Sequence, residues 1–344
     1  MSASDSHTHM FREAAQAPQA VRAQLQANAA RVQELAARLR RERPRAIVTC
    51  ARGSSDHAAT FARYLIETHL GLLTSSAAPS VSSVYAAQPD LAGAVMMAIS
   101  QSGASPDLLA AVTSARAAGA RIVALVNAED SPLAQLADDL IPLRAGEERS
   151  VAATKSYIAS LAAIVQLVAS WSQDAELDGA LQQAPELLER AWQLDWSAAV
   201  SRLTPAHNLY VVARGLGLAI AQEAALKFKE TCALHAEAVS AAELRHGPMA
   251  LVGRGFPLLV FAQHDESRAG VAELAGELAA RGAAVLLAGA TAAQTTVLPT
   301  QAAHPVIEPL LFAQSFYRMA NALSLARGHD PDRPPHLSKV TETL

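Results

Sequence analysis

Aromatic residues are scarce in this chain of 344 residues. Phe, Trp and Tyr together make up 4% of the sequence, whereas 51% of it is hydrophobic. The apolar residues are therefore mostly small and aliphatic, which is typical of helices packed on sheets. A chain of this length can form two domains of ordinary size, each with a core of its own.

Cysteine and net positive charge are also lacking. Cys50 and Cys232 lie far apart in apolar surroundings, which excludes a disulfide framework and a Cys-x-x-Cys zinc or redox motif. The net charge of −4 gives no general attraction for nucleic acid or for an anionic membrane surface. An anionic ligand would have to be held by local hydrogen-bond donors.

Targeting segments, membrane spans and common nucleotide motifs are absent from the sequence. The first ten residues are polar, and the longest apolar stretch, "YIASLAAIVQLVASW" (157–171), is too short for a span and is interpreted as an amphipathic helix. The Gly-x-Gly-x-x-Gly and Gly-Lys-Ser/Thr spacings are missing, and no residue cluster has metal-ligand spacing. We predict a soluble cytoplasmic protein without a metal, an organic cofactor, a nucleic-acid partner or a membrane.

The sequence does contain short apolar runs that alternate with helical patterns. One or two helices, interrupted near Pro18, are predicted over residues 11–42. Strands are then predicted at "RAIVTC", "AVMMAIS", "RIVALV" and "DLIPLR", with helices between them. Continuous apolar strands between helices indicate a parallel sheet covered on both faces.

The pattern repeats later in the chain. An Ala-Arg-Gly turn follows a strand at residues 51–53 and again at 213–215, an offset of 162 residues at which Gln101 also falls on Gln263. We predict two similar α/β sandwiches, joined by the helical stretch within residues 172–194. The expected boundaries are 1–24 for a polar start with the beginning of a helix, 25–175 and 201–330 for the two domains, 176–200 for a helical linker, and 331–344 for a tail over the active site.

Serine-rich turns follow two strands of the first copy, "ARGSS" and "SQSGASPD". Glycine lets a backbone approach a ligand, helix N-termini offer free N–H groups, and serine hydroxyls add donors without charge, a combination that suits a phosphate monoester. The alternative is helix capping, in which Ser55 or Ser105 serves only the local backbone with Asp107 in the first turn. The second copy has lost most of these hydroxyls, so the first copy is predicted to hold the ligand. A third polar turn, with Glu148, Ser150 and Thr154, is a weaker candidate.

An acid–base segment lies in the second copy, within residues 223–251. Lys227 and Glu230 are three residues apart and share a helix face, so the carboxylate can stay ionised and act as a base. A solvated surface pair is the alternative, and Lys229 is an equally ordinary surface residue. His246 precedes a Gly-Pro pair that fixes the backbone, which makes it a candidate proton shuttle. Glu243 and His235 are candidates for supporting roles.

These motifs together closely resemble the paired sugar isomerase (SIS) domains of glucosamine-6-phosphate synthase. The resemblance rests on "ISQSG", "SVAATKS", "LKFKETCALHAEAVSAAELRHGPMAL" and the closing "LSKVTET", and it covers residues 25–344. It implies an α/β fold of two tandem SIS domains, each a parallel five-stranded sheet flanked by helices in a three-layer α/β/α sandwich.

The resemblance also implies roles for individual residues. Glu230 would move a proton between C1 and C2 of the sugar, Lys227 would support it, and Lys339 would form or lie at an imine. His246 would open the sugar ring from the partner subunit of a homodimer. The residues expected to bind the phosphosugar or to line its rim are Arg52, Gly53, Ser54, Ser55, Ser100, Gln101, Ser102, Ser105, Val151 and Ser338.

Some departures from the synthase pattern bear on the reaction. The synthase begins with a glutamine-hydrolysing domain, whereas this chain has no such domain and no cysteine before Cys50, so we expect no internal ammonia supply. The tail "PPHLSKVTE" is similar to stand-alone SIS-type glucosamine-6-phosphate deaminases, with Pro335-His336 in place of Arg-Asn. "ARGSS" replaces Cys-Gly-Thr-Ser, which places Arg52 near the expected phosphate.

The function that these residues and the resemblance favour is deamination of glucosamine 6-phosphate to fructose 6-phosphate and ammonia. The alternatives are a phosphosugar aldose–ketose isomerase, a protein like the isomerase domain of the aminotransferase, and a deglycase acting on a 6-phosphorylated amine conjugate. A sensor without catalysis is the alternative of another class, and it would not need Glu230, His246 and Lys339 together. The tail, which by itself would be a frayed end, is then expected to be ordered with Lys339 at C2 of the sugar.

Overall fold

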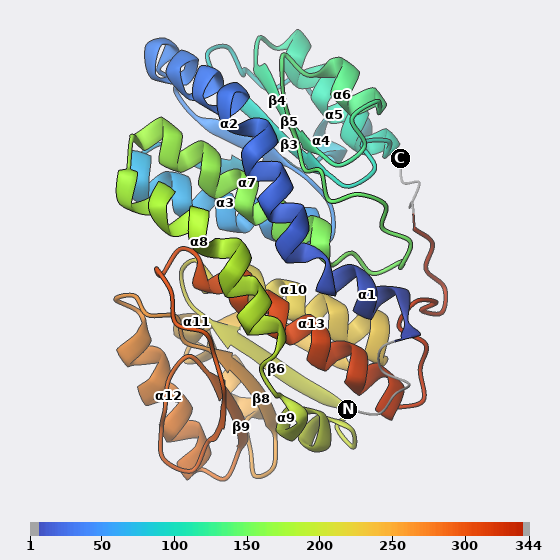
Figure 1. Ribbon diagram of the computed structural model, residues 1–344, viewed down its shortest axis with the longest axis vertical. Helices are drawn as coiled ribbons and strands as arrows, with labels where there is room; N and C mark the ends of the chain where they lie inside the picture. The colour runs from blue at the N-terminus through green and yellow to red at the C-terminus, as the bar shows by residue number, and fades with distance from the viewer. Residues whose placement is uncertain (1–6, 340–344) are drawn as a thin grey trace. The chain divides into compact units, whose positions relative to one another are not determined.

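The computed structural model describes residues 7–339, and within them the chain forms two compact units (Figure 1). The first unit comprises Gln19–Glu148, Lys155–Gln182 and the described residues from Ser338. The second unit comprises the described residues up to Pro18, Arg149–Thr154 and Gln183–Leu337. Each unit thus contains segments that are remote in sequence, and each contains one sheet.

The helical start of the chain is broken near Pro18, as predicted. Helix α1 (His9–Ala15) is capped by Thr8, whose side chain accepts the amide of Phe11, and α2 (Ala17–Glu42) follows after Gln16. Pro18 lies in the first turn of α2, where its missing N–H leaves no helical hydrogen bond unmade. The break therefore costs α2 nothing.

The first unit contains a five-stranded parallel sheet with the strand order β2-β1-β3-β4-β5. Its strands are β1 (Ile47–Cys50), β2 (Thr74–Ser76), β3 (Val95–Ser100), β4 (Arg121–Val126) and β5 (Asp139–Pro142). Its helices after α2 are α3 (Ser54–Leu70), α4 (Ser80–Ser83), α5 (Pro106–Ala117), α6 (Pro132–Leu136) and α7 (Lys155–Ser172). The predicted strands are all present, and the short edge strand β2 had no apolar run to indicate it.

Small aliphatic side chains fill the core between this sheet and α5. Met96, Ala98 and Ile122 on the strands pack against Leu108 and Val112 of α5, and all are buried. Short side chains let the helix lie close to the strands, which explains why the chain needs few aromatic residues. Figure 1 shows α5 and α6 on one side of this sheet and α3 and α7 on the other.

Helix α7 is buried on all sides, which corrects the interpretation of residues 157–171 as amphipathic. Every residue from Lys155 to Ala169 is buried. The polar residues among them are paired: Gln166 donates to the carbonyl of Leu25 at 3.0 Å, and Gln24 on α2 donates to the carbonyl of Ala159 at 2.9 Å. Because α2 covers α7, polar residues that suggested a wet face instead join two helices.

The second unit repeats the same sheet topology. Its strand order is β10-β9-β8-β6-β7, with all pairs parallel, so β7-β6-β8-β9-β10 corresponds to the first sheet strand by strand. The strands are β6 (Asn208–Ala213), β7 (His235–Ser240), β8 (Pro257–Phe261), β9 (Ala284–Ala288) and β10 (Thr296–Leu298). The helices are α9 (Ser197–Leu203), α10 (Gly217–Cys232), α11 (Ala241–Leu244), α12 (Arg268–Ala280) and α13 (Glu308–Ala326), with a 3-10 turn at Pro248–Leu251. The α/β class and the parallel five-stranded sheets are therefore confirmed.

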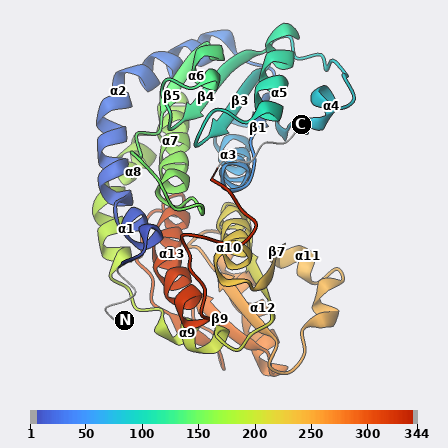
Figure 2. The same cartoon turned by 90° about the vertical axis from the view of Figure 1, so that its right-hand side faces the viewer.

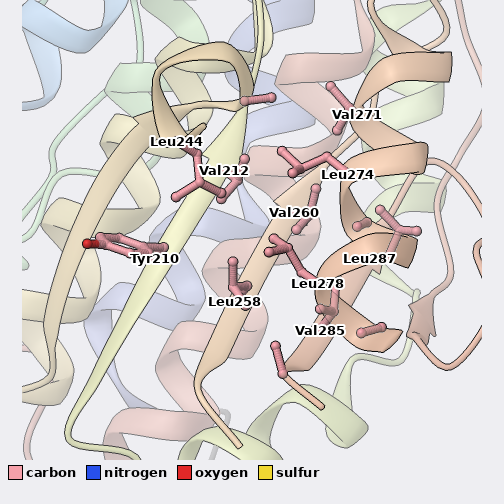
Figure 3. Close-up of a cluster of buried hydrophobic side chains, with 14 of the residues drawn as sticks. Tyr210, Val212, Leu244, Leu258, Val260, Val271, Leu274, Leu278, Val285 and Leu287 are labelled. Carbon is pink, nitrogen blue, oxygen red and sulfur yellow. The ribbon is translucent and has the colours of Figure 1, made fainter. Parts of the chain in front are cut away.

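The two faces of the second sheet are covered differently. On one face α12 packs Leu274 and Leu278 against Val212, Leu258 and Val260 of the strands (Figure 3). On the other face α10 contacts both β6 and α13, and Figure 2 shows these two helices as neighbours. Phe228 of α10 stacks edge-on against Phe316 of α13 at a centroid distance of 5.1 Å.

Helix α8 (Ala175–Trp192) carries the chain from the first unit into the second within the predicted helical stretch. The domain boundaries proposed from sequence stay predictions, since the units exchange segments that a linear division cannot represent. Within residues 7–339 no helix is long and apolar enough to cross a membrane.

Candidate functional site

The carboxyl ends of three neighbouring strands meet at one edge of the first sheet. Strand β3 ends at Ser100, between β1, which ends at Cys50, and β4, which ends at Val126. The two serine-rich turns follow β1 and β3, so they lie next to each other at this edge. This is the edge at which open α/β sheets bind ligands.

The turn after β1 is shaped by Gly53. This residue has a φ of 54°, which favours glycine, and it is the N-cap of α3 without any side-chain capping bond. Ser54 and Ser55 are the first residues of α3, and the Ser55 amide donates to the Arg52 carbonyl at 3.1 Å. The capping interpretation of Ser55 is therefore wrong, because the helix has already begun before it.

The turn after β3 needs glycine at position 103. Gly103 has a φ of 63°, and a Cβ there would lie 2.9 Å from Cγ2 of Val126 and closer still to Ser131. The hydroxyl oxygen of Ser100 accepts the Gly103 amide at 2.9 Å, and that of Ser102 accepts the Ala104 amide at 3.4 Å. The backbone is thereby fixed in a tight loop around the strand end.

Ser105 is the N-cap of α5, yet its side chain makes no capping hydrogen bond. Its hydroxyl thus does not serve the backbone of α5, contrary to the capping alternative. A hydroxyl at a helix N-terminus lies at the positive end of the helix dipole, where it is a suitable donor for an anion. The first turn of α5 also contains Asp107, which is 2% exposed.

Arg52 pairs with this buried carboxylate. Its Nε lies 2.9 Å and its Nη2 2.7 Å from Oδ2 of Asp107, while its side chain remains 54% exposed. The pair neutralises Asp107, which would otherwise repel an anion at the N-terminus of α5. Arg52 is thus held at the carboxyl edge of the first sheet, and its predicted place near a phosphate stays a prediction.

A loop at residues 145–148 brings a buried carboxylate into the first unit. The side chain of Asn127 accepts the Ala145 amide at 2.7 Å and donates to the Gly146 carbonyl at 2.9 Å, which holds the loop at the end of β4. Glu148, whose side chain is fully buried, accepts from the hydroxyl of Ser156 at 2.7 Å.

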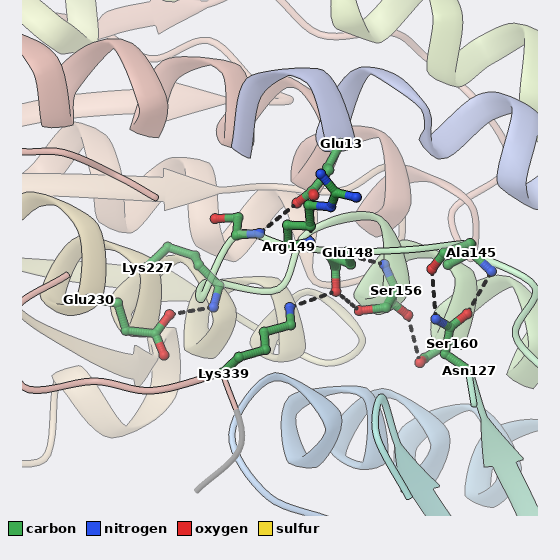
Figure 4. A network of polar contacts seen from close by, with 12 residues as sticks. Glu13, Asn127, Ala145, Glu148, Arg149, Ser156, Ser160, Lys227, Glu230 and Lys339 are labelled. Atoms are coloured by element: carbon green, nitrogen blue, oxygen red, sulfur yellow. Dashed lines mark hydrogen bonds and ion pairs between the residues drawn. The ribbon is translucent and has the colours of Figure 1, made fainter. Parts of the chain in front are cut away.

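The tail lysine contacts Glu148. Nζ of Lys339 lies 3.4 Å from Oε2 of Glu148, and the Lys339 side chain is 26% exposed (Figure 4). The structure therefore describes the chain as far as Lys339, the tail lysine that was predicted to act on the sugar, whereas residues 340–344 lie outside the described part. The contact with the sugar that was predicted for Lys339 stays a prediction.

The predicted polar turn at residues 146–157 is divided between the units. Ser150, Val151 and Thr154 belong to the second unit, where the amides of Arg149 and Ser150 donate to the carboxylate of Glu13 on α1 at 2.6 and 3.1 Å. Glu148 belongs to the first. Glu13 was not a sequence candidate, because its partner lies 136 residues further along the chain.

Three charged residues share one face of α10. Nζ of Lys227 lies 2.5 Å from Oε2 of Glu230 and 3.5 Å from Oε1 of Glu223, and the hydroxyl of Tyr317 on α13 donates to Glu223 at 2.9 Å. The side chains of Lys227 and Glu223 are 1% and 0% exposed, whereas that of Glu230 is 21% exposed. The interpretation of Lys227 and Glu230 as a solvated surface pair is therefore wrong.

This α10 cluster has one accessible acid. The ammonium of Lys227 faces two carboxylates, of which that of Glu230 is exposed and that of Glu223 is buried. Glu223 and Tyr317 were missed from the sequence. The spacing of four residues between Glu223 and Lys227 could have indicated Glu223, but nothing local could have indicated Tyr317, which lies 94 residues away.

Glu230 borders a pocket of about 530 Å³ in the second unit. Leu226, Lys229 and Glu230 of α10 line it together with tail residues that include Arg333, Pro335 and Leu337. The tail turns there at His336, whose φ of 65° is unusual for a residue other than glycine but is tolerated by His more often than by most residues. The tail up to Leu337 therefore forms one wall of the space beside the acid.

His246 is exposed, in a turn where its amide donates to the Glu243 carbonyl at 2.9 Å. Within the second unit no ion pair joins His246 to Glu230 among the described residues. His235 and Glu243 are exposed as well. The structure thus leaves the predicted role of His246 untested.

Neither Cys50 nor Cys232 is suited to act as a nucleophile. Burial raises the pKa of the Cys50 thiol to about 12 and that of the Cys232 thiol to about 11. Among the described residues there is no group of three or more His, Cys, Asp or Glu side chains that could hold a metal ion.

The two sheets coincide with two matches to one protein family. Residues 40–170 and 202–307 both match the model of the SIS domain family. The chain belongs to this family, and each of the two matched ranges contains all five strands of one sheet.

The most informative relatives are enzymes of phosphorylated sugars. The glutamine–fructose-6-phosphate aminotransferase of Aeropyrum pernix is 36% identical over 309 residues, which is 84% of this chain and 49% of that protein. The chain therefore spans about half the length of the curated relatives it matches.

Three solved structures share the fold of this chain. A Silicibacter pomeroyi protein that carries the provisional name phosphosugar isomerase has a TM-score of 0.91 at 43% identity, covering 94% of this chain and all of that one. The C-terminal domain of the Francisella tularensis glucosamine-fructose-6-phosphate aminotransferase has a TM-score of 0.88 at 25% identity, covering 97% and 100%. A glucosamine-6-phosphate deaminase of Thermotoga maritima, at 21% identity and a TM-score of 0.77 over 98% and 100%, is alike in fold alone.

Proposed function

We propose that this protein is a glucosamine-6-phosphate deaminase, which converts glucosamine 6-phosphate and water to fructose 6-phosphate and ammonia. The observation that carries the proposal is the α10 cluster: an accessible carboxylate, Glu230, held by a buried ammonium beside a pocket. A base of this kind is what a proton shift between two neighbouring carbons requires. Its location in an SIS-domain protein related to aminotransferases of fructose 6-phosphate supports an amino sugar phosphate as substrate.

Glu230 takes the proton from C2 of the open-chain sugar and returns it to C1. The aldehyde at C1 becomes an alcohol, and the amine at C2 becomes an iminium, so the step is an internal redox exchange without an external oxidant. Lys227 is protonated and buried between two carboxylates, so it keeps Glu230 ionised and oriented rather than exchanging protons itself.

Lys339 exchanges with the C2 iminium and releases ammonia, and water then hydrolyses the lysine imine to the ketone. An attack by this lysine needs the neutral amine, so the proton held in the ion pair with Glu148 must first be transferred. Glu148, at 3.4 Å, is the group that can receive it. Direct hydrolysis of the iminium by water is the alternative route to the same products.

The serine-rich turns hold the 6-phosphate in this proposal. Ser54, Ser55 and Ser105 lie at the N-termini of α3 and α5, where serine hydroxyls and the positive ends of two helix dipoles lie at one sheet edge. Arg52 supplies the cation at that edge, already oriented by Asp107. His246, which is exposed, opens the sugar ring from the partner subunit of a homodimer.

A phosphosugar aldose–ketose isomerase is the second candidate, favoured by the provisional name of the relative from Silicibacter pomeroyi. It would use the same proton transfer by Glu230 but would need no amine chemistry at C2. Lys339 would then be dispensable for turnover, which separates the two reactions.

The test is incubation with glucosamine 6-phosphate and measurement of ammonia and fructose 6-phosphate. We expect both products in equal amounts, and none from glucosamine without the phosphate. A ketose–aldose interconversion without ammonia would refute the deaminase and support the isomerase. The variant Lys339→Arg keeps the positive charge beside Glu148 but removes a primary amine, and we expect it to lose most deaminase turnover.

A further inference from the structure

Helix α1 contacts two segments that are continuous with residues of the proposed lysine chemistry. One is the loop that begins with Arg149, directly after Glu148, and the other is the tail that leads to Lys339. The stretch Arg149–Thr154 and the tail up to Leu337 both belong to the second unit, as α1 does. The contacts of α1 with these two stretches are therefore contacts within one unit.

The carboxylate of Glu13 holds the start of the loop. It accepts the amide of Arg149 at 2.6 Å and the amide of Ser150 at 3.1 Å, and Glu13 is 6% exposed (Figure 4). Hydrogen bonds from backbone amides to an ionised carboxylate are stronger than those between neutral groups, so the loop is firmly fixed at this point. Because Arg149 is bonded directly to Glu148 along the chain, Glu13 also restrains where Glu148 can lie.

The N-terminus of α1 holds the tail. The carboxylate of Asp332 accepts the amide of His9 at 2.6 Å and the amide of Met10 at 2.7 Å, one through each of its oxygens. Amides in the first turn of a helix have no partner within the helix, and the helix dipole favours a carboxylate there. Asp332 therefore fixes the tail a short way before Lys339.

Helix α1 is in turn anchored on α13 near both of its ends. The hydroxyl of Thr8 donates to Oδ1 of Asn321 at 2.6 Å, and Nε2 of Gln314 donates to the carbonyl of Ala14 at 3.0 Å. Between these two positions α13 carries Tyr317, which donates to the α10 cluster. A helix of seven residues is not stable alone, so α1 depends on these contacts. Helix α13 is thus a common support for α1 and for the acid–base cluster.

A purely structural explanation covers the two acids only in part. First-turn amides of a helix and amides of a loop can be satisfied by nearby side chains or by water, and they need no particular distant segment. Here α1 joins Glu13 and Asp332, and these hold the loop that continues from Glu148 and the tail that continues to Lys339. Glu148 and Lys339 form the ion pair on which the proposed imine step depends.

We propose that Glu13 and Asp332 are positioning residues, which act through α1 to hold Glu148 and Lys339 in place for the exchange at the C2 iminium. This rests on the proposed function, because the exchange is a step of the deamination. In that step the neutral amine of Lys339 bonds to C2, the bond from C2 to the original nitrogen breaks, and this nitrogen leaves as ammonia without a net change in protons. The proton transfer by Glu230 does not use the lysine, so it should not depend on either positioning acid.

The test separates deamination from proton transfer. Ammonia release from glucosamine 6-phosphate uses the lysine in this proposal, whereas exchange of a C1 hydrogen of fructose 6-phosphate with solvent deuterium uses Glu230. For Glu13→Ala and Asp332→Ala we expect kcat for ammonia release to fall on the order of 10²-fold, as for a reacting group displaced by about 1 Å, with KM and the deuterium exchange largely kept. Glu34→Ala, which removes an exposed acid of α2, is the control and should keep both rates. An equal fall in both rates, or no fall in either, would overturn the inference.

Deuterium uptake by backbone amides, measured by mass spectrometry, decides the inference even if no ammonia is released. Because the acids act through α1, we expect Asp332→Ala to raise uptake in the loop at 149–154, whose amides Glu13 holds, and Glu13→Ala to raise it in the tail at 331–337. Asp332→Asn keeps an acceptor oxygen and should lie between the native chain and Asp332→Ala. Uptake that changes only beside each substitution would overturn the inference. The expected changes in a native chain that releases no ammonia would refute the deaminase and leave the positioning by α1 standing.

Discussion

The two sheets have the same strand order, yet the polar side chains at their carboxyl edges differ in their hydrogen-bond partners. In the first sheet the turns after β1 and β3 leave the Ser105 hydroxyl without a capping role and present Arg52. In the second sheet the matching turn is closed by its own side chains: Gln263 donates to Asp265, and Asp265 accepts the hydroxyl of Ser267 at 2.6 Å. An edge whose polar groups are already paired with one another has few donors left for a phosphate.

In the helices that follow the matching turns, it is the second copy that has charged residues where the first copy has apolar ones. At the offset of 162 residues, Glu223 and Lys227 of α10 correspond to Phe61 and Leu65 of α3, both of which are fully buried. One copy thus combines an open turn with an apolar helix, and the other combines a closed turn with a charged helix. Under the proposed function, the repeated scaffold divides phosphate binding and acid–base chemistry between its two copies.

Removal of the accessible acid should have the largest effect. Glu230→Gln keeps the shape of the side chain but cannot accept a proton, so we expect kcat to fall on the order of 10²–10⁴-fold with phosphosugar binding largely kept. Steady-state kinetics and calorimetry provide the two readings. Glu237→Gln, at an exposed position of β7, is the control, and a parallel loss of binding and turnover in Glu230→Gln would contradict its role as a base.

Removal of the buried ammonium should cost stability as well as turnover. Lys227→Met removes the ammonium that lies 3.5 Å from the buried carboxylate of Glu223, and we expect the free energy of unfolding to fall by about 3–5 kcal/mol. Denaturant titration of this variant and of Lys229→Met, two residues away and exposed, measures the difference. An equal, small loss in both would show that the α10 cluster is not an energetically coupled unit.

The open turn of the first sheet should depend on Gly103. Gly103→Ala places a side chain in a left-handed conformation and against Val126, so we expect a loss of at least about 1–2 kcal/mol together with weaker phosphosugar binding. Gly270→Ala in α12 meets open space and should be neutral or slightly stabilising. Thermal unfolding distinguishes the two, and similar melting temperatures would contradict the steric explanation.

The hydroxyls of the two edges should differ in a binding assay. Ser105→Ala is expected to weaken phosphosugar binding by roughly 1 kcal/mol, because a donor to the phosphate is lost. Ser267→Ala, in the closed turn, removes a bond to Asp265 and should leave phosphosugar affinity as it is. If the two variants bind alike, the assignment of the phosphate to the first edge is wrong.

The smallest effect concerns Asp56 in the first turn of α3, where the second copy has Leu218. Burial raises the pKa of Asp56, so the folded state binds its proton more readily than the unfolded state does. This contribution to stability is present below the ordinary pKa and is lost as the pH rises through the raised one. We expect Asp56→Asn to be more stable than the native chain at pH 7 and to show no gain at acidic pH, as measured by denaturant titration at the two pH values.

Local sequence features predicted the frame of the molecule well. Apolar runs and Gly or Ser punctuation indicated the strands β1, β3 and β4 and the turns that follow them, because these depend on neighbouring residues. The short strands β2 and β10 and the strand β7, which contains His235, were missed. Those strands lie at sheet edges or contain polar residues, so no apolar run in the sequence indicates them.

The sequence named several charged residues as candidates, but it did not predict the contacts that they make, and it missed Glu223 and Tyr317. The spacing of Lys227 and Glu230 determined that they share a helix face, and the sequence of the tail singled out Lys339. Only the tertiary structure decided that Lys227 is buried between Glu223 and Glu230, that Tyr317 completes this cluster, and that Glu148 meets an amine 191 residues away. Helix periodicity is set by the chain itself, whereas burial and ion pairing depend on which distant segments pack together.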